Sequence, residues 1–175
     1  MSKLIKEKIR TVPHWPIVGV MFRDITTLIE DPEGFRHTCD LFHERYRDMD
    51  IDKIVGIDAR GFIFGGVLAY QLGVGFTPVR KKGKLPYSTI EESYELEYGE
   101  ATVEIHDDSI KKGERVVIID DLIATGGTMV ASANLVERLG GEIVELSIVI
   151  ELVDLGGRDK LKKYDMFSLT KYKGE

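Results

Sequence analysis

The chain has 175 residues, of which 43% are hydrophobic and 31% charged, and its formal net charge is −6 at pH 7. This composition is typical of one globular domain with its own core, and the acidic balance argues against general nucleic-acid binding, which depends on basic surfaces. No apolar stretch approaches the ~18 residues of a membrane span, the charged N-terminal sequence lacks a signal-peptide core, and Cys39 is the single cysteine, so we expect a cytoplasmic protein without disulfides, bound to neither nucleic acid nor membrane.

Amphipathic stretches alternate with short apolar runs along the chain. Apolar side chains recur at helical spacing from Phe35 to Met49, so the first helix is predicted over about Pro32–Asp48. Further helices are predicted over Gly61–Leu72 and from about Met129 to Leu139, before the Gly140–Gly141 stop. Apolar runs predict the strands Lys53–Ile57, Gly75–Val79, Arg115–Ile119 and Ile143–Ile150.

The run Val116–Ile119 contains no polar residue. A strand without polar alternation is typical of a parallel sheet that helices cover on both faces. Together with the alternation of strands and helices, it predicts a doubly wound α/β fold with a mostly parallel central sheet. In such folds, ligands bind beyond the carboxyl ends of the strands.

A polar segment, residues 81–106, interrupts this alternation. Ser93–Tyr98 and Ala101–His106 flank Gly99 and predict a β-hairpin. A long polar excursion from an α/β core is either a lid over a binding site or a surface hairpin without a role, and loop length alone does not decide between them.

Residues 116–128, VVIIDDLIATGGT, combine a buried strand, an acidic pair and a glycine-rich turn that opens a helix. Adjacent carboxylates at a strand end can accept hydrogen bonds from two neighbouring ribose hydroxyls. Glycines let backbone N–H groups approach an anion, and a helix N-terminus favours negative charge. The pattern therefore indicates a site for a sugar phosphate. It is neither a P-loop nor a dinucleotide-binding fingerprint, because both motifs are absent.

This string resembles the 5-phosphoribosyl-1-diphosphate (PRPP) signature of type I phosphoribosyltransferases. The resemblance implies that Asp120 and Asp121 bind the ribose hydroxyls. The implied residues around the 5′-phosphate are Ala124, Thr125, Gly126, Gly127 and Thr128.

Two segments resemble the diphosphate site of the adenine-specific branch of this family. Residues 56–65, GIDARGFIFG, again follow a strand and open a helix, and residues 80–86, RKKGKLP, form a basic cluster in an acidic chain. From the residues alone, Arg60 would equally suit a surface salt bridge, and a solvated lysine run is the more usual interpretation of the basic cluster. The implied diphosphate-binding residues are Asp58, Ala59, Arg60, Gly61, Arg80, Lys81 and Lys84.

Residues 19–26, GVMFRDIT, resemble the adenine-binding hood of that branch. The resemblance implies that Phe22 stacks on the base while the backbone around Met21 and Arg23 contacts its edge; core packing is the alternative from the residues alone. Residues 96–99, LEYG, resemble the lid motif, which makes Glu97 the implied acid–base residue.

Taken together, the resemblance implies one domain over residues 1–175, with a hood (1–34) and a flexible hairpin lid (81–106). The implied reaction joins adenine to PRPP, giving AMP and diphosphate for purine salvage, with Mg²⁺ carried by PRPP rather than by direct protein ligands, and with a homodimer as the assembly. The alternatives are a phosphoribosyltransferase for hypoxanthine, guanine or xanthine and a non-catalytic PRPP sensor. No lysine follows the ATGGT turn at an obvious base-facing position, which favours adenine.

Overall fold

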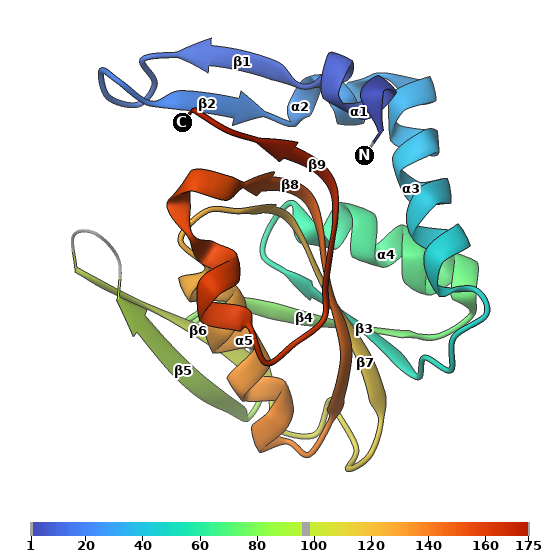
Figure 1. Cartoon of the computed structure of the whole chain (residues 1–175). Coiled ribbons are helices and arrows are strands. Elements are labelled where there is room, and N and C mark those ends of the chain that lie inside the picture. The colour runs from blue at the N-terminus through green and yellow to red at the C-terminus, as the bar shows by residue number, and fades with distance from the viewer. Residues whose placement is uncertain (1, 96–98, 175) are drawn as a thin grey trace.

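A seven-stranded sheet forms the centre of the computed structural model, which describes residues 2–95 and 99–174. The strands are β3 (Lys53–Ile57), β4 (Gly75–Lys81), β5 (Thr89–Glu95), β6 (Glu100–His106), β7 (Arg115–Ile123), β8 (Glu142–Leu152) and β9 (Met166–Tyr172). Their order is β5-β6-β4-β3-β7-β8-β9 (Figure 1). Strands β4, β3, β7, β8 and β9 run parallel, whereas β5 and β6 are antiparallel additions at one edge. The predicted mostly parallel α/β sheet is confirmed.

Strand β7 lies in the interior of the sheet, and its residues Val116–Ile119 are fully buried, as their unbroken apolar run predicts. It continues four residues beyond its predicted end because β8 keeps pairing with it, with Asp120 opposite Ile148 and Ile123 opposite Glu151. Asp120 and Asp121 therefore lie within the strand rather than after it.

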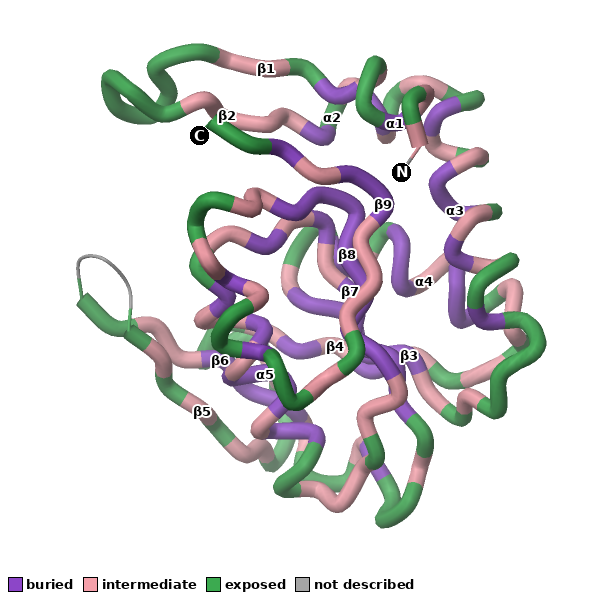
Figure 2. The backbone as a smooth tube through the Cα atoms, in the orientation of Figure 1, coloured by how far each residue is buried: buried purple, intermediate pink, exposed green. Residues whose placement is uncertain are grey.

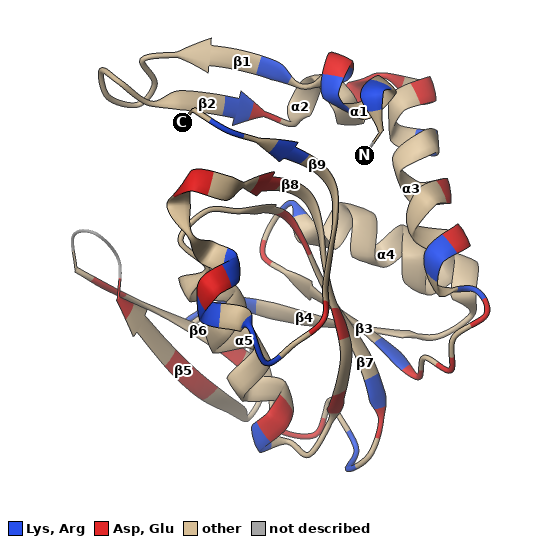
Figure 3. Ribbon diagram, in the orientation of Figure 1, with Lys and Arg blue, Asp and Glu red and all other residues tan. Residues whose placement is uncertain are grey.

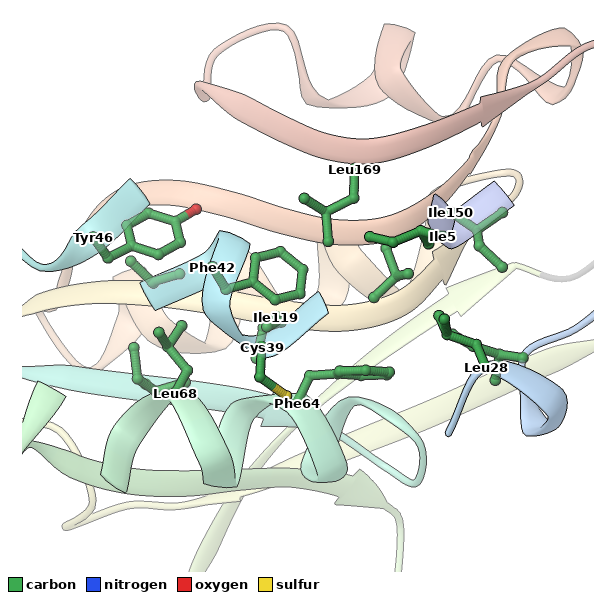
Figure 4. Close-up of a cluster of buried hydrophobic side chains, with 14 of the residues drawn as sticks. Ile5, Leu28, Cys39, Phe42, Tyr46, Phe64, Leu68, Ile119, Ile150 and Leu169 are labelled. Atoms are coloured by element: carbon green, nitrogen blue, oxygen red, sulfur yellow. The ribbon is translucent and has the colours of Figure 1, made fainter. Parts of the chain in front are cut away.

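Helices cover both faces of the sheet. Helices α3 (Pro32–Tyr46) and α4 (Gly61–Leu72) pack on one face, and α5 (Gly127–Arg138) packs on the other (Figure 1). Alternate residues of β7 serve the two cores, since Val117 and Ile119 belong to the first and Val116 and Ile118 to the second. Figure 4 shows the first core, where Phe42, Phe64 and Leu68 surround Ile119.

The predicted bounds of α4 and β3 match the structure, but α3 ends at Tyr46, two residues before its predicted end. Met49, which the helical spacing had included, is 38% exposed, and its N–H donates to the carbonyl of Tyr46 in a turn. The turn carries the chain directly into β3.

The N-terminal segment forms a small layer of its own. It contains α1 (Lys3–Lys8), an antiparallel ribbon of β1 (Arg10–Pro13) and β2 (Met21–Asp24), and α2 (Thr26–Glu30). Figure 1 shows this layer beside β9, the last strand. The N–H of Ser2 donates to the carbonyl of Leu169, and the Lys6 ammonium donates to that of Lys171. These hydrogen bonds join the N-terminal segment to β9, near the C-terminus.

The hairpin of β5 and β6 extends the sheet beyond β4, through the pairs Arg80–Glu104 and Lys81–Val103. Its first strand begins at Thr89, four residues before the predicted start. β6 is buried along its second half, whereas β5 alternates between exposed and half-buried residues (Figure 2). In the part of the chain that the structure describes, no helix is long and apolar enough to cross a membrane.

Candidate active site

A pocket of about 570 Å³ lies at the carboxyl ends of β3, β4 and β7. Strand β3 is the point at which the sheet order reverses, because the chain passes from β3 outward to β4 and then returns to β7 on the other side. Ligands of doubly wound sheets bind at such a switch point. The β3–α4 turn, the end of β4, the β7–α5 turn and the hairpin all contribute to the walls.

The whole Ala124–Thr128 turn lines the pocket and leads into the N-terminus of α5. Gly126 is the N-cap, has a φ of 81° and offers no side chain to the helix. By contrast, the Ser2 and Asp31 side chains cap α1 and α3. The first N–H groups of α5 therefore remain available, and with the helix dipole they suit a phosphate.

A close backbone contact supports this turn from behind. A Cβ on Gly126 would lie 2.8 Å from the carbonyl oxygen of Gly157, and a Cβ on Gly157 would lie 2.3 Å from that of Ala124. Only glycine fits at both positions, and the positive φ of Gly126 adds to the requirement. The sequence pattern did not identify Gly157, which belongs to the turn Gly157–Leu161 between β8 and β9.

The acidic pair lies side by side in the pocket wall. The backbone N–H of Asp121 donates to Oδ1 of Asp120 at 2.8 Å. Burial, and then the neighbouring charge of Asp121, raise the pKa of Asp120 well above its ordinary value. The pair can thus offer both hydrogen-bond donors and acceptors to hydroxyl groups.

The β3–α4 turn brings Asp58, Ala59 and Arg60 to the pocket. The Arg60 Nε donates to Asp121, which joins this turn to β7. Burial lowers the pKa of Arg60, but the charges of Asp121, Asp120 and Asp24 raise it by more.

Gly61, the residue predicted beside them, does not line the pocket. A Cβ there would lie 2.8 Å from the carbonyl oxygen of Ile119, so this glycine allows α4 to start directly against β7. No side chain caps α4 either, so its first N–H groups are also available.

Three cations of the basic cluster, Arg80, Lys81 and Lys84, converge on the same pocket. Arg80 Nε donates to Asp58 at 3.1 Å, whereas Lys82 turns away and pairs with Glu91 at 2.6 Å. Figure 3 shows acidic residues along β5, the edge strand beyond β6.

The predicted base-binding residues Met21, Phe22 and Arg23 lie in β2 and do not line this pocket. Phe22 packs edge-on against Trp15, with ring centroids 4.4 Å apart, and Arg23 lies 4.3 Å over the ring of Tyr172. All three are half-buried.

The tip of the N-terminal layer is apolar and open to solvent. Trp15 is 50% exposed, Ile17 66% and Val18 87%. Because the charge of Asp24 acts on Arg60, the end of β2 lies within electrostatic reach of the pocket.

Glu97 lies outside the described residues, but the hairpin that carries it contacts the site. Tyr94 lines the pocket, and its hydroxyl accepts a hydrogen bond from Thr128 Oγ1 at 2.9 Å. Its ring lies so close to the turn that a Cβ on Gly127 would be 2.7 Å from it. Sequence reasoning missed Tyr94, because nothing in a half-exposed strand marks a side chain that faces the anion turn.

Comparison with known proteins agrees with this geometry. Residues 25–174 match the phosphoribosyl transferase domain family. The adenine phosphoribosyltransferase of Desulfosudis oleivorans is 63% identical over 171 residues, which cover 98% of this chain and 99% of the relative.

Solved structures share the fold. The adenine phosphoribosyltransferase of Thermoanaerobacter pseudethanolicus aligns with a TM-score of 0.92 at 49% identity, covering 96% of this chain and 98% of its own. The Saccharomyces cerevisiae enzyme, solved with adenine and D-2,5-dideoxy-2,5-imino-altritol 1,6-bisphosphate, aligns with a TM-score of 0.90 at 40% identity, covering 97% and 100%.

Proposed function

The chain belongs to the phosphoribosyltransferase family, and we propose that it is the member that transfers the 5-phosphoribosyl group of PRPP to adenine, giving AMP and diphosphate. One observation carries the proposal. A single pocket joins an uncapped helix N-terminus, an acidic pair and a group of cations. These three features follow the order of 5′-phosphate, ribose and diphosphate in PRPP.

In this proposal the Ala124–Thr128 turn binds the 5′-phosphate through its N–H groups and through the hydroxyl of Thr125. The Thr128 hydroxyl, which donates to Tyr94 here, would turn to the phosphate when PRPP binds. Asp120 and Asp121 bind the two ribose hydroxyls. Because the turn and the acidic pair belong to one continuous strand–turn–helix unit, they fix the sugar relative to the phosphate.

The diphosphate lies against Asp58, Ala59 and Arg60 on one side and against Arg80, Lys81 and Lys84 on the other. Negative charge develops on this group as its bond to the ribose breaks, so cations that are already in place stabilise the transition state. Gly61 contributes through the close start of α4 rather than through a pocket wall.

The oxygen atoms in and around the pocket are of the kind that Mg²⁺ prefers. Within the described ranges no cluster of three or more acidic, histidine or cysteine side chains is arranged around a metal position. PRPP oxygens and waters would coordinate Mg²⁺, and Asp120 and Asp121, which bind the ribose hydroxyls, would offer oxygens to the waters around the ion. Bound in this way, Mg²⁺ neutralises charge on the diphosphate.

We place adenine between the pocket and the β1–β2 ribbon, with Phe22 against the ring and Met21 and Arg23 at its edge. Nitrogen 9 then attacks carbon 1 of the ribose while the bond from carbon 1 to the diphosphate oxygen breaks. Glu97 accepts the proton that the base gives up. The hairpin, residues 81–106, covers the reacting atoms and excludes water, which would otherwise hydrolyse PRPP at carbon 1 of the ribose. The Tyr94–Thr128 contact supports this placement of the hairpin.

We further propose that the 1–175 chain is one domain with residues 1–34 as its hood, that it forms a homodimer, and that it acts in purine salvage in the cytoplasm.

The experiment is product analysis with purified protein, PRPP and Mg²⁺. The proposal requires AMP and diphosphate in equal amounts from adenine, and loss of both when PRPP is omitted. PRPP binding without any product would instead favour the sensor.

A further inference from the structure

Glu104 is a buried carboxylate beside the basic end of the pocket. It lies in β6 directly opposite Arg80 of β4, and only 3% of its surface is exposed. Its side chain does not line the pocket, so it has no direct contact to offer a ligand there. By charge alone, a carboxylate here weakens the local positive potential and disfavours a polyanion.

The hydrogen bonds of Glu104 go to the backbone of the basic cluster. Its Oε1 accepts from the N–H of Lys84 and from that of Leu85, both at 2.8 Å. On the other side of the same residue, Arg80 Nη1 donates to the carbonyl of Lys84 at 3.2 Å. Both backbone groups of Lys84 are therefore held by side chains of adjacent strands.

The carboxylate is ionised in this setting. Burial raises the pKa of Glu104, but the N–H groups of Leu85, Gly83 and Lys84 lower it by more, so its pKa lies below the ordinary value. Glu104 thus fixes the 82–85 turn, which needs the positive φ of Gly83.

This turn determines where Lys84 points, whereas Lys81 is the last residue of β4 and pairs with Val103 of β6. Lys81 and Lys84 both line the pocket, and in residues 2–95 and 99–174 neither ammonium group has an ion-pair partner. Long lysine side chains lose much freedom when they bind, so a fixed backbone lowers the cost of aiming them at an anion.

We propose that Glu104 is a positioning residue for diphosphate binding: it holds the 82–85 turn so that Lys84, together with Lys81, faces the diphosphate of PRPP. This inference rests on the proposed function, because the anion is identified as PRPP. It assigns to a negative charge the opposite effect from the one that charge alone predicts.

Three variants of Glu104 separate geometry from charge. Glu104→Gln keeps an oxygen acceptor but removes the charge. Glu104→Asp keeps the charge but shortens the reach by one methylene. Glu104→Ala removes both. The matched control is Glu114→Ala at the opposite end of the sheet, where Glu114 likewise accepts from a loop N–H, that of Lys111, at 2.8 Å.

For each variant, the KM values for PRPP and adenine are measured, together with the Kd of PRPP by calorimetry with Mg²⁺. We expect Glu104→Ala and Glu104→Asp to raise the KM and Kd of PRPP roughly tenfold, because the loss of two hydrogen bonds frees the turn. Glu104→Gln and Glu114→Ala are expected to stay within about threefold of the wild type, and the KM for adenine is expected to change little in all four.

The inference is overturned if Glu104→Asp binds PRPP as tightly as the wild type, or if Glu104→Gln and Glu104→Asp are equally impaired. Tighter PRPP binding by Glu104→Gln would also overturn it, because charge would then outweigh position. If Glu104→Ala does not fold, the Gln and Asp variants still decide. Calorimetry keeps the inference separate from the proposed function, because a wild type that binds PRPP but forms no AMP would contradict only the latter.

Discussion

The Arg60 guanidinium forms an ion pair with Asp121 across the pocket, which joins the turn after β3 to the strand that precedes the anion turn. Asp121 is almost fully buried, whereas half of the Arg60 side chain is exposed. Arg60 therefore neutralises the acidic pair when PRPP is absent, and it lies at the boundary between the proposed ribose and diphosphate positions.

Replacing Arg60 with alanine is expected to raise the KM for PRPP by about 10- to 100-fold, because a charged fork for the diphosphate is lost and Asp121 is left without its partner. Steady-state kinetics with adenine at saturation measure this. Arg60→Lys keeps the positive charge but loses the two-pronged geometry of the guanidinium, so its KM for PRPP should lie between those of the wild type and Arg60→Ala. An unchanged KM in Arg60→Ala would remove Arg60 from the site.

Asp120 is expected to destabilise the free protein at neutral pH. Its pKa is raised by burial and by Asp121, so folding favours the protonated acid. With respect to Asp120, the folded protein therefore has its full stability at low pH, where this side chain is protonated. It loses part of that stability as the pH rises from the ordinary pKa of an aspartate toward the raised pKa of Asp120.

Asp120→Asn cannot ionise at this position, so this variant does not lose that unfolding free energy as the pH rises. Relative to the wild type, it should gain about 1 kcal/mol or more in unfolding free energy at pH 8, and much less at pH 4. Urea unfolding at the two pH values measures the difference. A variant that is less stable than the wild type at pH 8 would show that Asp120 is well solvated as a carboxylate.

Glu151 is expected to stabilise the Gly157–Leu161 turn, which packs behind the Ala124–Thr128 turn. It is 3% exposed, receives hydrogen bonds from Arg158 Nε and Nη2 at 2.7 and 2.6 Å and from Ser168 at 2.7 Å, and its pKa is lowered to about 2. Hydrogen bonding by Arg158 is the largest cause of this shift. The resulting stability is present above the ordinary pKa and is lost as the pH falls toward 2.

At pH 7, Glu151→Gln should therefore lose about 2 kcal/mol of unfolding free energy, a figure reduced for the partial exposure of Arg158. The deficit should shrink as the pH falls below 4. Because Arg158 follows Gly157, which contacts Gly126, we also expect a higher KM for PRPP. Equal deficits at pH 7 and pH 3 would contradict the electrostatic origin.

Gly126→Ala is expected to cost about 1–3 kcal/mol of stability and to raise the KM for PRPP, because a side chain at a φ of 81° meets the carbonyl of Gly157. Gly66→Ala is the control. It lies within α4 with no atom near its added Cβ, and it should be neutral or stabilising by about 0.5–1 kcal/mol. Thermal unfolding and PRPP kinetics compare the two.

The parts of the fold that the sequence predicted depend on local pattern. β3 and α4 have their predicted bounds because each is defined by neighbouring residues. β3 is a short apolar run, and α4 begins at Gly61 and ends before Gly73. The Ala124–Thr128 turn likewise lies at a helix N-terminus, as a contiguous string predicts.

The parts that were missed depend on contacts between distant residues. β1 and β2 are short and have no fully buried residue, and β9 depends on distant contacts such as that between Ser2 and Leu169. Gly157 matters because the Ala124–Gly126 backbone approaches it, and Glu104 lies beside Arg80 because β6 pairs with β4. No window of the sequence contains both partners of these pairs.

The most direct test of the account is a competition among bases. The protein is mixed with PRPP, Mg²⁺ and equal concentrations of adenine, hypoxanthine, guanine and xanthine, and each nucleotide is quantified over time. The account predicts that AMP accumulates at the expense of PRPP and that the other three nucleotides stay near background. Preferential formation of IMP, GMP or XMP would contradict the assignment of adenine, and no nucleotide at all, with PRPP bound, would contradict the proposed transferase activity.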